Sequence, residues 1–248
     1  MAALLVSPLQ SGQERDGLTP MPWCPGQPVP PLASGPFDQE TPALLLLDRR
    51  AAGAAPNICD LVSLLDRGEQ ARAQSFRRPD DRERYRLGRA ALRQVLGAWL
   101  DRDPAALRFA TGPHGKPELV GPECSSPQSQ PPHFNLSHSG DLILLAFHAS
   151  HPVGVDVERH QPDLDWRPIA RRCLDPAQVE SLLALPPAEA YSAFFESWCD
   201  LEAGLKARGV GLAQASEAQV LAMEPRLRRW RLALPAGYAG AVARLDPA

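Results

Sequence analysis

Three short apolar segments joined by tight turns, at residues 133–158, constrain the fold more than any other part of the chain. The middle segment, "LILLAFH" (142–148), is apolar on both faces, which is typical of the central strand of a sheet. The turns at 139–141 and 150–152 are too short for parallel crossovers, which need a dozen or more residues. We therefore expect an antiparallel meander whose third strand is "VGVDVE" (153–158).

Helical patterns flank this sheet. One helix is expected over 68–77, and a second is expected to start at Pro79, since proline suits the first helical turn. A third, long helix follows Pro186-Pro187 and ends at Gly209. With a buried strand at 41–48 and a C-terminal hairpin, the mixture predicts the α+β class. Residues 1–40 hold eight prolines and little periodicity, so we expect a disordered extension.

Composition narrows the class of protein. The net charge is −3, charged residues make up 22%, and no apolar run approaches the ~20 residues of a membrane helix. The five cysteines are scattered, and none forms a C-x-x-C pair. We expect a cytoplasmic monomer that binds neither nucleic acid nor membrane.

Two pairs of polar residues stand out. Asp156 and Glu158 are two apart on a strand, so both leave the same face, and oxygen ligands of this kind suit Mg²⁺. A solvated strand face is the simpler alternative. Glu202 and Lys206 are four apart on the long helix and share a face, where the alternative is a surface ion pair of ~0.3–0.5 kcal/mol. Trp198 belongs to an apolar stripe expected to anchor that helix.

Serine, histidine and arginine residues suggest further chemistry. Ser137 and His138 lie in "FNLSHS", but a serine hydrolase is disfavoured because the G-x-S-x-G elbow is missing and adjacent strand residues point to opposite faces. His138 is either a phosphate ligand or a histidine satisfied by its neighbours. Residues 67–93 hold nine arginines, which favours an anionic ligand or an acidic partner over a plain mixed-charge helix.

Four motifs occur in order: "GKP" (115–117), "FNLSHS" (134–139), "GVDVE" (154–158) and "FFESWCDLEAGLK" (194–206). In order and approximate spacing they closely resemble the 4′-phosphopantetheinyl transferases of the surfactin-synthetase-activating (Sfp-like) type. The resemblance covers roughly 41–245. It implies a pseudo-twofold pair of similar α/β halves, at 41–152 and 153–248, with coenzyme A in the cleft between them.

The resemblance also implies a reaction. Mg²⁺ would be held by Asp156, Glu158 and Glu202, with Glu202 as general base and Lys206 offsetting phosphate charge. Phosphopantetheine would pass from coenzyme A to a serine of an apo acyl or peptidyl carrier protein, releasing adenosine 3′,5′-bisphosphate. The coenzyme would be bound by matching residues: Arg72, Arg84, Lys116, Ser137 and His138.

One departure from the family pattern is clear. The helix motif usually reads W-x-x-K-E, whereas this chain has Leu201 at the lysine position and Asp200 before it. A non-catalytic relative that binds coenzyme A or a carrier protein is therefore the alternative function. The sequence does not indicate whether a fatty acid, polyketide or peptide synthase is served.

Overall fold

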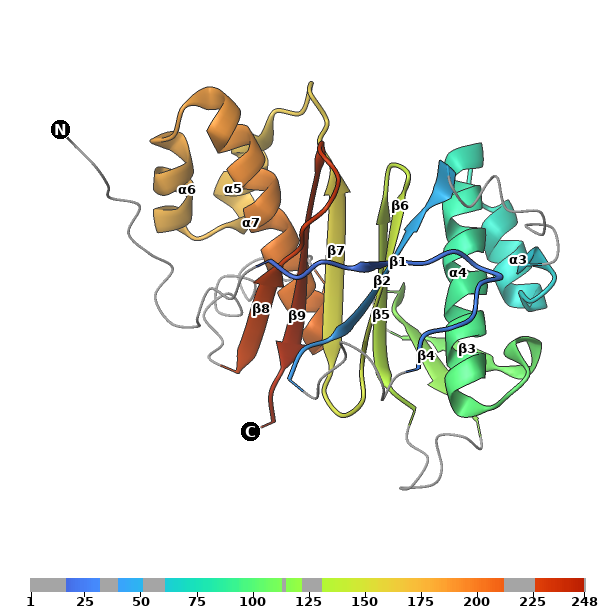
Figure 1. Cartoon of the computed structure of the whole chain (residues 1–248). Helices are drawn as coiled ribbons and strands as arrows, with labels where there is room; N and C mark the ends of the chain where they lie inside the picture. Colours follow the sequence, from blue (N-terminus) through green and yellow to red (C-terminus); the bar gives the residue numbers. More distant parts are fainter. Residues whose placement is uncertain are drawn as a thin grey trace.

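The computed structural model describes residues 17–31, 40–50, 61–112, 115–121, 131–211 and 226–247. The protein consists of two halves, each with a 22-residue helix packed on a sheet (Figure 1); the sheet of the C-terminal half is antiparallel, and that of the N-terminal half is antiparallel except for the parallel β1-β2 pair. The predicted α+β class is confirmed.

The N-terminal half contains a sheet of order β1-β2-β6-β5 and a separate β3-β4 hairpin. Its strands are β1 (Met21–Pro22), β2 (Ala43–Asp48), β3 (Arg108–Thr111), β4 (Pro117–Val120), β5 (His133–Ser139) and β6 (Leu142–His148). Its helices are α3 (Arg67–Gln74), α4 (Pro79–Leu100) and the short 3₁₀ helix η1 (Pro104–Ala106).

The C-terminal half contains a sheet of order β7-β9-β8, made of β7 (Val153–Arg159), β8 (Leu227–Arg231) and β9 (Tyr238–Leu245). Its helices are α5 (Trp166–Cys173), α6 (Pro176–Leu183) and α7 (Pro187–Arg208). No helix in the described part of the chain is long and apolar enough to cross a membrane.

The long helices α4 and α7 are built alike. Each starts with proline in its first turn, where a missing N–H costs no helical hydrogen bond. Each is followed by a residue in the left-handed region, Asp101 (φ 50°) after α4 and Gly209 (φ 71°) after α7. These local signals explain why both helix starts were predictable from the sequence.

The meander expected at 133–158 is correct for two strands and wrong for the third. β6 is central and buried throughout, with β5 antiparallel on one side. However, β2 occupies the other edge of β6, so β7 cannot pair there. Instead β7 lies beside β5 and runs parallel to it, and it forms its backbone ladder with β9.

The seam between β5 and β7 is closed by side chains. Asn135 Oδ1 accepts the N–H of Val155 at 2.8 Å, and Ser139 Oγ accepts that of Arg159 at 3.1 Å. Ser137 Oγ lies 3.4 Å from the nitrogen of Val157. Each pair is twenty residues apart, which fixes the parallel register. Neutral polar side chains thus replace a backbone ladder where the halves meet.

A shared apolar layer also joins the halves. It contains Leu44 and Leu144 from the first half and Val155, Trp230 and Val242 from the second. Since the valines of β7 face this layer, Asp156 and Glu158 on the alternate positions face the side of α7.

Residues 17–31 do not form the disordered extension expected for 1–40. Leu18 forms a parallel bridge with Leu232, β1 pairs with β2, and Trp23 is only 3% exposed. The segment crosses from the C-terminal half to α4, where the Trp99 indole donates to Pro30 O at 2.7 Å (Figure 1). Proline carbonyls still accept hydrogen bonds, so a proline-rich segment can pack without a ladder. Residues 1–16 and 32–39 lie outside the described residues.

Candidate functional site

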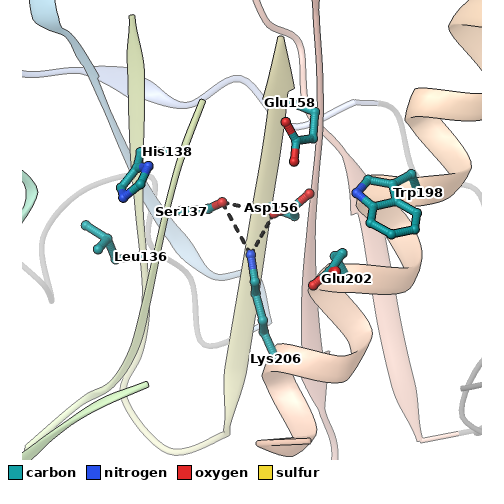
Figure 2. Close-up of a pocket in the computed structure, with 8 residues that line it drawn as sticks. All are labelled: Leu136, Ser137, His138, Asp156, Glu158, Trp198, Glu202 and Lys206. Carbon is teal, nitrogen blue, oxygen red and sulfur yellow. Dashed lines mark hydrogen bonds and ion pairs between the residues drawn. The ribbon is translucent and has the colours of Figure 1, made fainter. Parts of the chain in front are cut away.

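A polar pocket of about 310 Å³ opens at the seam between the two halves (Figure 2). Strand β5, strand β7 and helix α7 all contribute to its lining: Leu136, Ser137, His138, Asp156, Glu158, Trp198, Glu202 and Lys206. Six of these eight are predicted site residues, brought together from three segments of the chain.

Gly154 explains how α7 comes so close to β7. A methyl group at this position would collide with the backbone of Ala203 and Ala207, so only glycine permits the observed approach. The approach brings Lys206, in the last turn of α7, against the carboxylate of Asp156.

Asp156 is the most constrained acid of the pocket. It is 3% exposed, and its Oδ1 accepts hydrogen bonds from Ser137 Oγ at 2.9 Å and Lys206 Nζ at 2.6 Å (Figure 2). Its Oδ2 is buried and has no hydrogen-bond partner among the described residues. A buried carboxylate oxygen without a partner is costly, so this oxygen is available to a cation or a hydrogen-bond donor.

Glu158 and Glu202 are held less firmly. The Glu158 carboxylate accepts one hydrogen bond, from Ser139 Oγ at 2.7 Å. Burial raises its pKa, although the Ser139 bond opposes the shift. Burial likewise raises the pKa of Glu202, against the effect of Lys206, and within the described residues Glu202 makes no hydrogen bond or ion pair. A carboxylate with a raised pKa accepts a proton more readily than a free one.

Lys206 remains a cation. Burial lowers the pKa of its ammonium group, but the carboxylate of Asp156 outweighs burial, and the net pKa is raised. Its Nζ also lies 3.3 Å from Ser137 Oγ and from Val155 O. The group can therefore offset negative charge in the pocket, but it is a poor base.

Ser137 and His138 are not arranged as a nucleophile and its base. The hydroxyl of Ser137 points toward Asp156, while the His138 ring lies on the other side of β5 (Figure 2). Burial lowers the pKa of His138, a backbone hydrogen bond opposes the shift, and Arg84 and Lys206 lower the pKa further. The geometry agrees with the sequence argument against a hydrolase.

The three remaining predicted residues lie outside the pocket lining. Arg84 donates to Gly140 O at 2.8 Å, in the turn that follows β5, and pairs with Asp81. Lys116 Nζ donates to Val153 O at 3.2 Å and to Lys206 O at 3.0 Å, so it ties the β3-β4 hairpin to β7 and α7. Arg72 is exposed on α3, where its guanidinium lies over the ring of Phe76.

Two lining residues were not predicted. Trp198 was interpreted only as an anchor of the helix, yet it lines the pocket. Its spacing of four from Glu202 was the available signal, since both share a helical face. Leu136 carried no signal. Leu201, at the family's usual lysine position, is 6% exposed and packs in the apolar core under α7, so it does not line the pocket.

The donor set suits Mg²⁺ only together with a substrate. Among the described residues, no group of three or more His, Cys, Asp or Glu side chains is arranged to hold a metal ion alone. Mg²⁺, however, is usually bound by one or two carboxylates, with water and substrate phosphates completing the octahedron. Asp156 Oδ2, which has no hydrogen-bond partner among the described residues, could be one of these carboxylate ligands.

Comparisons with known proteins agree with the motifs. Residues 152–232 match the 4′-phosphopantetheinyl transferase superfamily, and residues 54–150 match the description "4′-phosphopantetheinyl transferase, N-terminal". The similar proteins include the 4′-phosphopantetheinyl transferase HetI of Nostoc, 36% identical over 65% of this chain and 66% of its own length. The 4′-phosphopantetheinyl transferase Sfp of Bacillus subtilis is 30% identical over 61% and 63%, respectively. The matches thus span just under two thirds of these relatives.

Proposed function

The chain belongs to the 4′-phosphopantetheinyl transferase family, and we propose that it moves phosphopantetheine from coenzyme A to a serine of an acyl or peptidyl carrier protein. The observation that carries this proposal is the buried Oδ2 of Asp156, which has no hydrogen-bond partner among the described residues and lies in a pocket that also holds Glu158, Glu202 and Lys206. Such a pocket has the ligands for a cation and a fixed positive charge for a diphosphate.

In this proposal Asp156, Glu158 and Glu202 would hold Mg²⁺, and the diphosphate of coenzyme A would supply further oxygen ligands. The bound ion would neutralise the charge that develops on the phosphate oxygens during phosphoryl transfer. Asp156 and Ser137 keep the Lys206 ammonium in place, where it adds positive charge.

Glu202 is proposed as general base, directly or through water. It takes the proton of the carrier serine as the serine oxygen forms a bond to the β-phosphorus. The bond from that phosphorus to the leaving phosphate then breaks, and adenosine 3′,5′-bisphosphate departs. In the metal-free pocket burial raises the pKa of Glu202, so the free side chain accepts a proton more readily than an ordinary glutamate.

The coenzyme 3′-phosphate is assigned to His138 and Arg84. His138 lines the pocket, and the positive charge of Arg84 acts on it. Lys116 and Arg72 remain candidates on the resemblance alone. The contacts of Lys116 with Val153 O and Lys206 O support a role in holding α7 rather than in touching the coenzyme.

The alternative, a non-catalytic binder, rests on Leu201. Because Leu201 packs in the core instead of lining the pocket, its presence does not remove a charge that faces the substrate. The geometry therefore favours the transferase.

The test is a mass measurement. A panel of apo carrier proteins from fatty acid, polyketide and peptide synthases is incubated with the full chain, coenzyme A and Mg²⁺. We expect the mass of one phosphopantetheine group to be added to at least one carrier, and to none when Mg²⁺ is chelated. Binding of coenzyme A without any mass change across the panel would favour the non-catalytic alternative.

A further inference from the structure

The turn between β5 and β6, at residues 139–141, is held from both halves of the molecule. Arg84 of α4 donates to Gly140 O at 2.8 Å. Arg49, just after β2, donates through Nη2 to Asp141 Oδ1 at 2.9 Å, and its backbone N–H donates to Asp141 O at 2.7 Å. These contacts fix the turn to the N-terminal half.

Tyr238 of β9 holds the same turn from the C-terminal half. Its Oη accepts the backbone N–H of Asp141 at 2.9 Å. The approach is close, because a methyl group at Gly140 (φ +57°) would collide with Tyr238 Oη and with the side chain of Arg159. Glycine is thus required here both by backbone conformation and by the tyrosine.

The turn begins with Ser139, which contacts a site residue. Ser139 Oγ donates to Glu158 Oε2 at 2.7 Å and accepts the N–H of Arg159 at 3.1 Å. Within the described residues, the Glu158 carboxylate makes no other hydrogen bond or ion pair. The direction of this carboxylate therefore depends on where the turn places Ser139.

We propose that Tyr238 is a positioning residue, which fixes the carboxylate of Glu158 through the 139–141 turn and Ser139. The inference rests on the proposed function in one respect, that Glu158 is a metal ligand. Tyr238 is not among the residues that line the pocket, and within the described residues it makes no hydrogen bond to the Glu158 carboxylate, so its effect passes through the turn.

The experiment measures Mn²⁺ binding to the full chain by electron paramagnetic resonance, with coenzyme A present and no carrier protein. Ser139→Ala removes the one hydrogen bond that the Glu158 carboxylate accepts within the described residues, and the Mn²⁺ dissociation constant should rise about tenfold or more, as for other partners of metal ligands. Tyr238→Phe removes only Oη, and a rise of about three- to tenfold is expected, the effect of one hydrogen bond. Tyr85→Phe, a half-buried tyrosine of α4, is the matched control and should change nothing.

The double variant supplies the decisive comparison. If Tyr238 acts through Ser139, then Tyr238→Phe has no further effect on the Mn²⁺ dissociation constant in the Ser139→Ala background. A merely structural tyrosine would lower the unfolding temperature in both backgrounds and leave the dissociation constant unchanged in both. That result, or an equal additional loss in the Ser139→Ala background, overturns the proposal.

Failure of the proposed function gives a different result. If the parent protein binds Mn²⁺ and shows this non-additivity but modifies no carrier protein, the transferase assignment is wrong and the role of Tyr238 stands. If the parent protein modifies carriers and both variants bind Mn²⁺ as well as the parent does, only the role of Tyr238 is wrong. If the parent protein binds no Mn²⁺ in the presence of coenzyme A, both the proposed function and the role of Tyr238 are wrong.

Discussion

The two long helices, α4 and α7, occupy equivalent places in their halves, but the carboxylates around them differ in what they contact. Near α4 every acid of the 66–93 stretch has an arginine partner. Glu69 pairs with Arg89 and Arg93, while the remaining pairs are Asp66–Arg93, Asp80–Arg49, Asp81–Arg84 and Glu83–Arg49. Near α7 the pocket acids share one lysine, and Asp156 Oδ2 has no partner in the described part of the chain.

The ion-paired acids near α4 stabilise the fold, whereas the acids near α7 belong to the candidate site. Buried ion pairs that are fully matched, such as Glu69 with two arginines, lock elements together and leave nothing for a ligand. Carboxylates buried with too few cations raise the energy of the apo protein, and either protonation or a bound cation lowers that energy. The same residue types thus hold the first half together and form the candidate site in the second.

The largest expected effect is on rate. Glu202→Gln should lower carrier modification by about 10²–10⁴-fold, because glutamine keeps the shape but accepts no proton. Glu189→Gln, on the exposed side of the same helix, is the control. Turnover is measured at saturating coenzyme A and Mg²⁺, and a loss of only a few-fold would make Glu202 a structural residue.

Asp156→Asn should lower the rate by about 10²–10³-fold, the scale for losing one preorganised electrostatic group. The variant should also unfold at a lower temperature, since Lys206 loses its carboxylate partner at 2.6 Å. Excess Mg²⁺ should restore little activity. Near-normal turnover at ordinary Mg²⁺ would exclude Asp156 as a ligand.

Stability should change in opposite directions in the two halves. Glu69→Gln leaves Arg89 and Arg93 buried without their partner and should cost about 3–5 kcal/mol. Glu202→Gln should stabilise the apo protein near neutral pH, because burial raises the pKa of Glu202 and so disfavours its charged form. Urea unfolding of both variants without metal measures this, and equal signs would contradict the comparison.

A smaller effect is expected on coenzyme binding at the seam. His138→Ala and Arg84→Ala should each raise the KM for coenzyme A roughly ten- to a hundredfold, from the loss of a charge-assisted bond of about 1.5–3 kcal/mol. The KM for dephospho-coenzyme A should change much less, since it lacks the 3′-phosphate. Equal losses for both nucleotides would assign the two residues to the fold.

The smallest effect concerns acid stability. The hydrogen bond from Arg49 lowers the pKa of Asp141 below its ordinary value, with burial opposing the shift. The ionised pair therefore stabilises the fold above about pH 4, and this contribution is lost as pH falls through the lowered pKa. Asp141→Asn should flatten that part of the stability curve relative to the parent, whereas Asp163→Asn, an exposed change, should not. Parallel curves for parent and Asp141→Asn below pH 4 would show that the pair contributes nothing.

The sequence by itself determined the local elements and the faces of their side chains. Period-two and period-3.6 patterns placed Asp156 with Glu158 and Glu202 with Lys206, because these spacings depend only on backbone geometry. Proline at the helix starts, glycine after α7 and four ordered motifs were equally local signals, and they were enough to identify the family.

Only the tertiary structure decided how these pieces meet. β7 lies beside β5 and not β6 because β2 already fills the free edge of β6, a competition between segments about a hundred residues apart. The close packing at Gly154 brings Lys206 against Asp156 Oδ1, while Oδ2 has no hydrogen-bond partner among the residues that the structure describes. Long-range packing also places residues 17–31 against the rest of the fold and lets Lys116 Nζ donate to Lys206 O. No short-range pattern encodes these contacts, because each depends on the free energy of the whole assembled core.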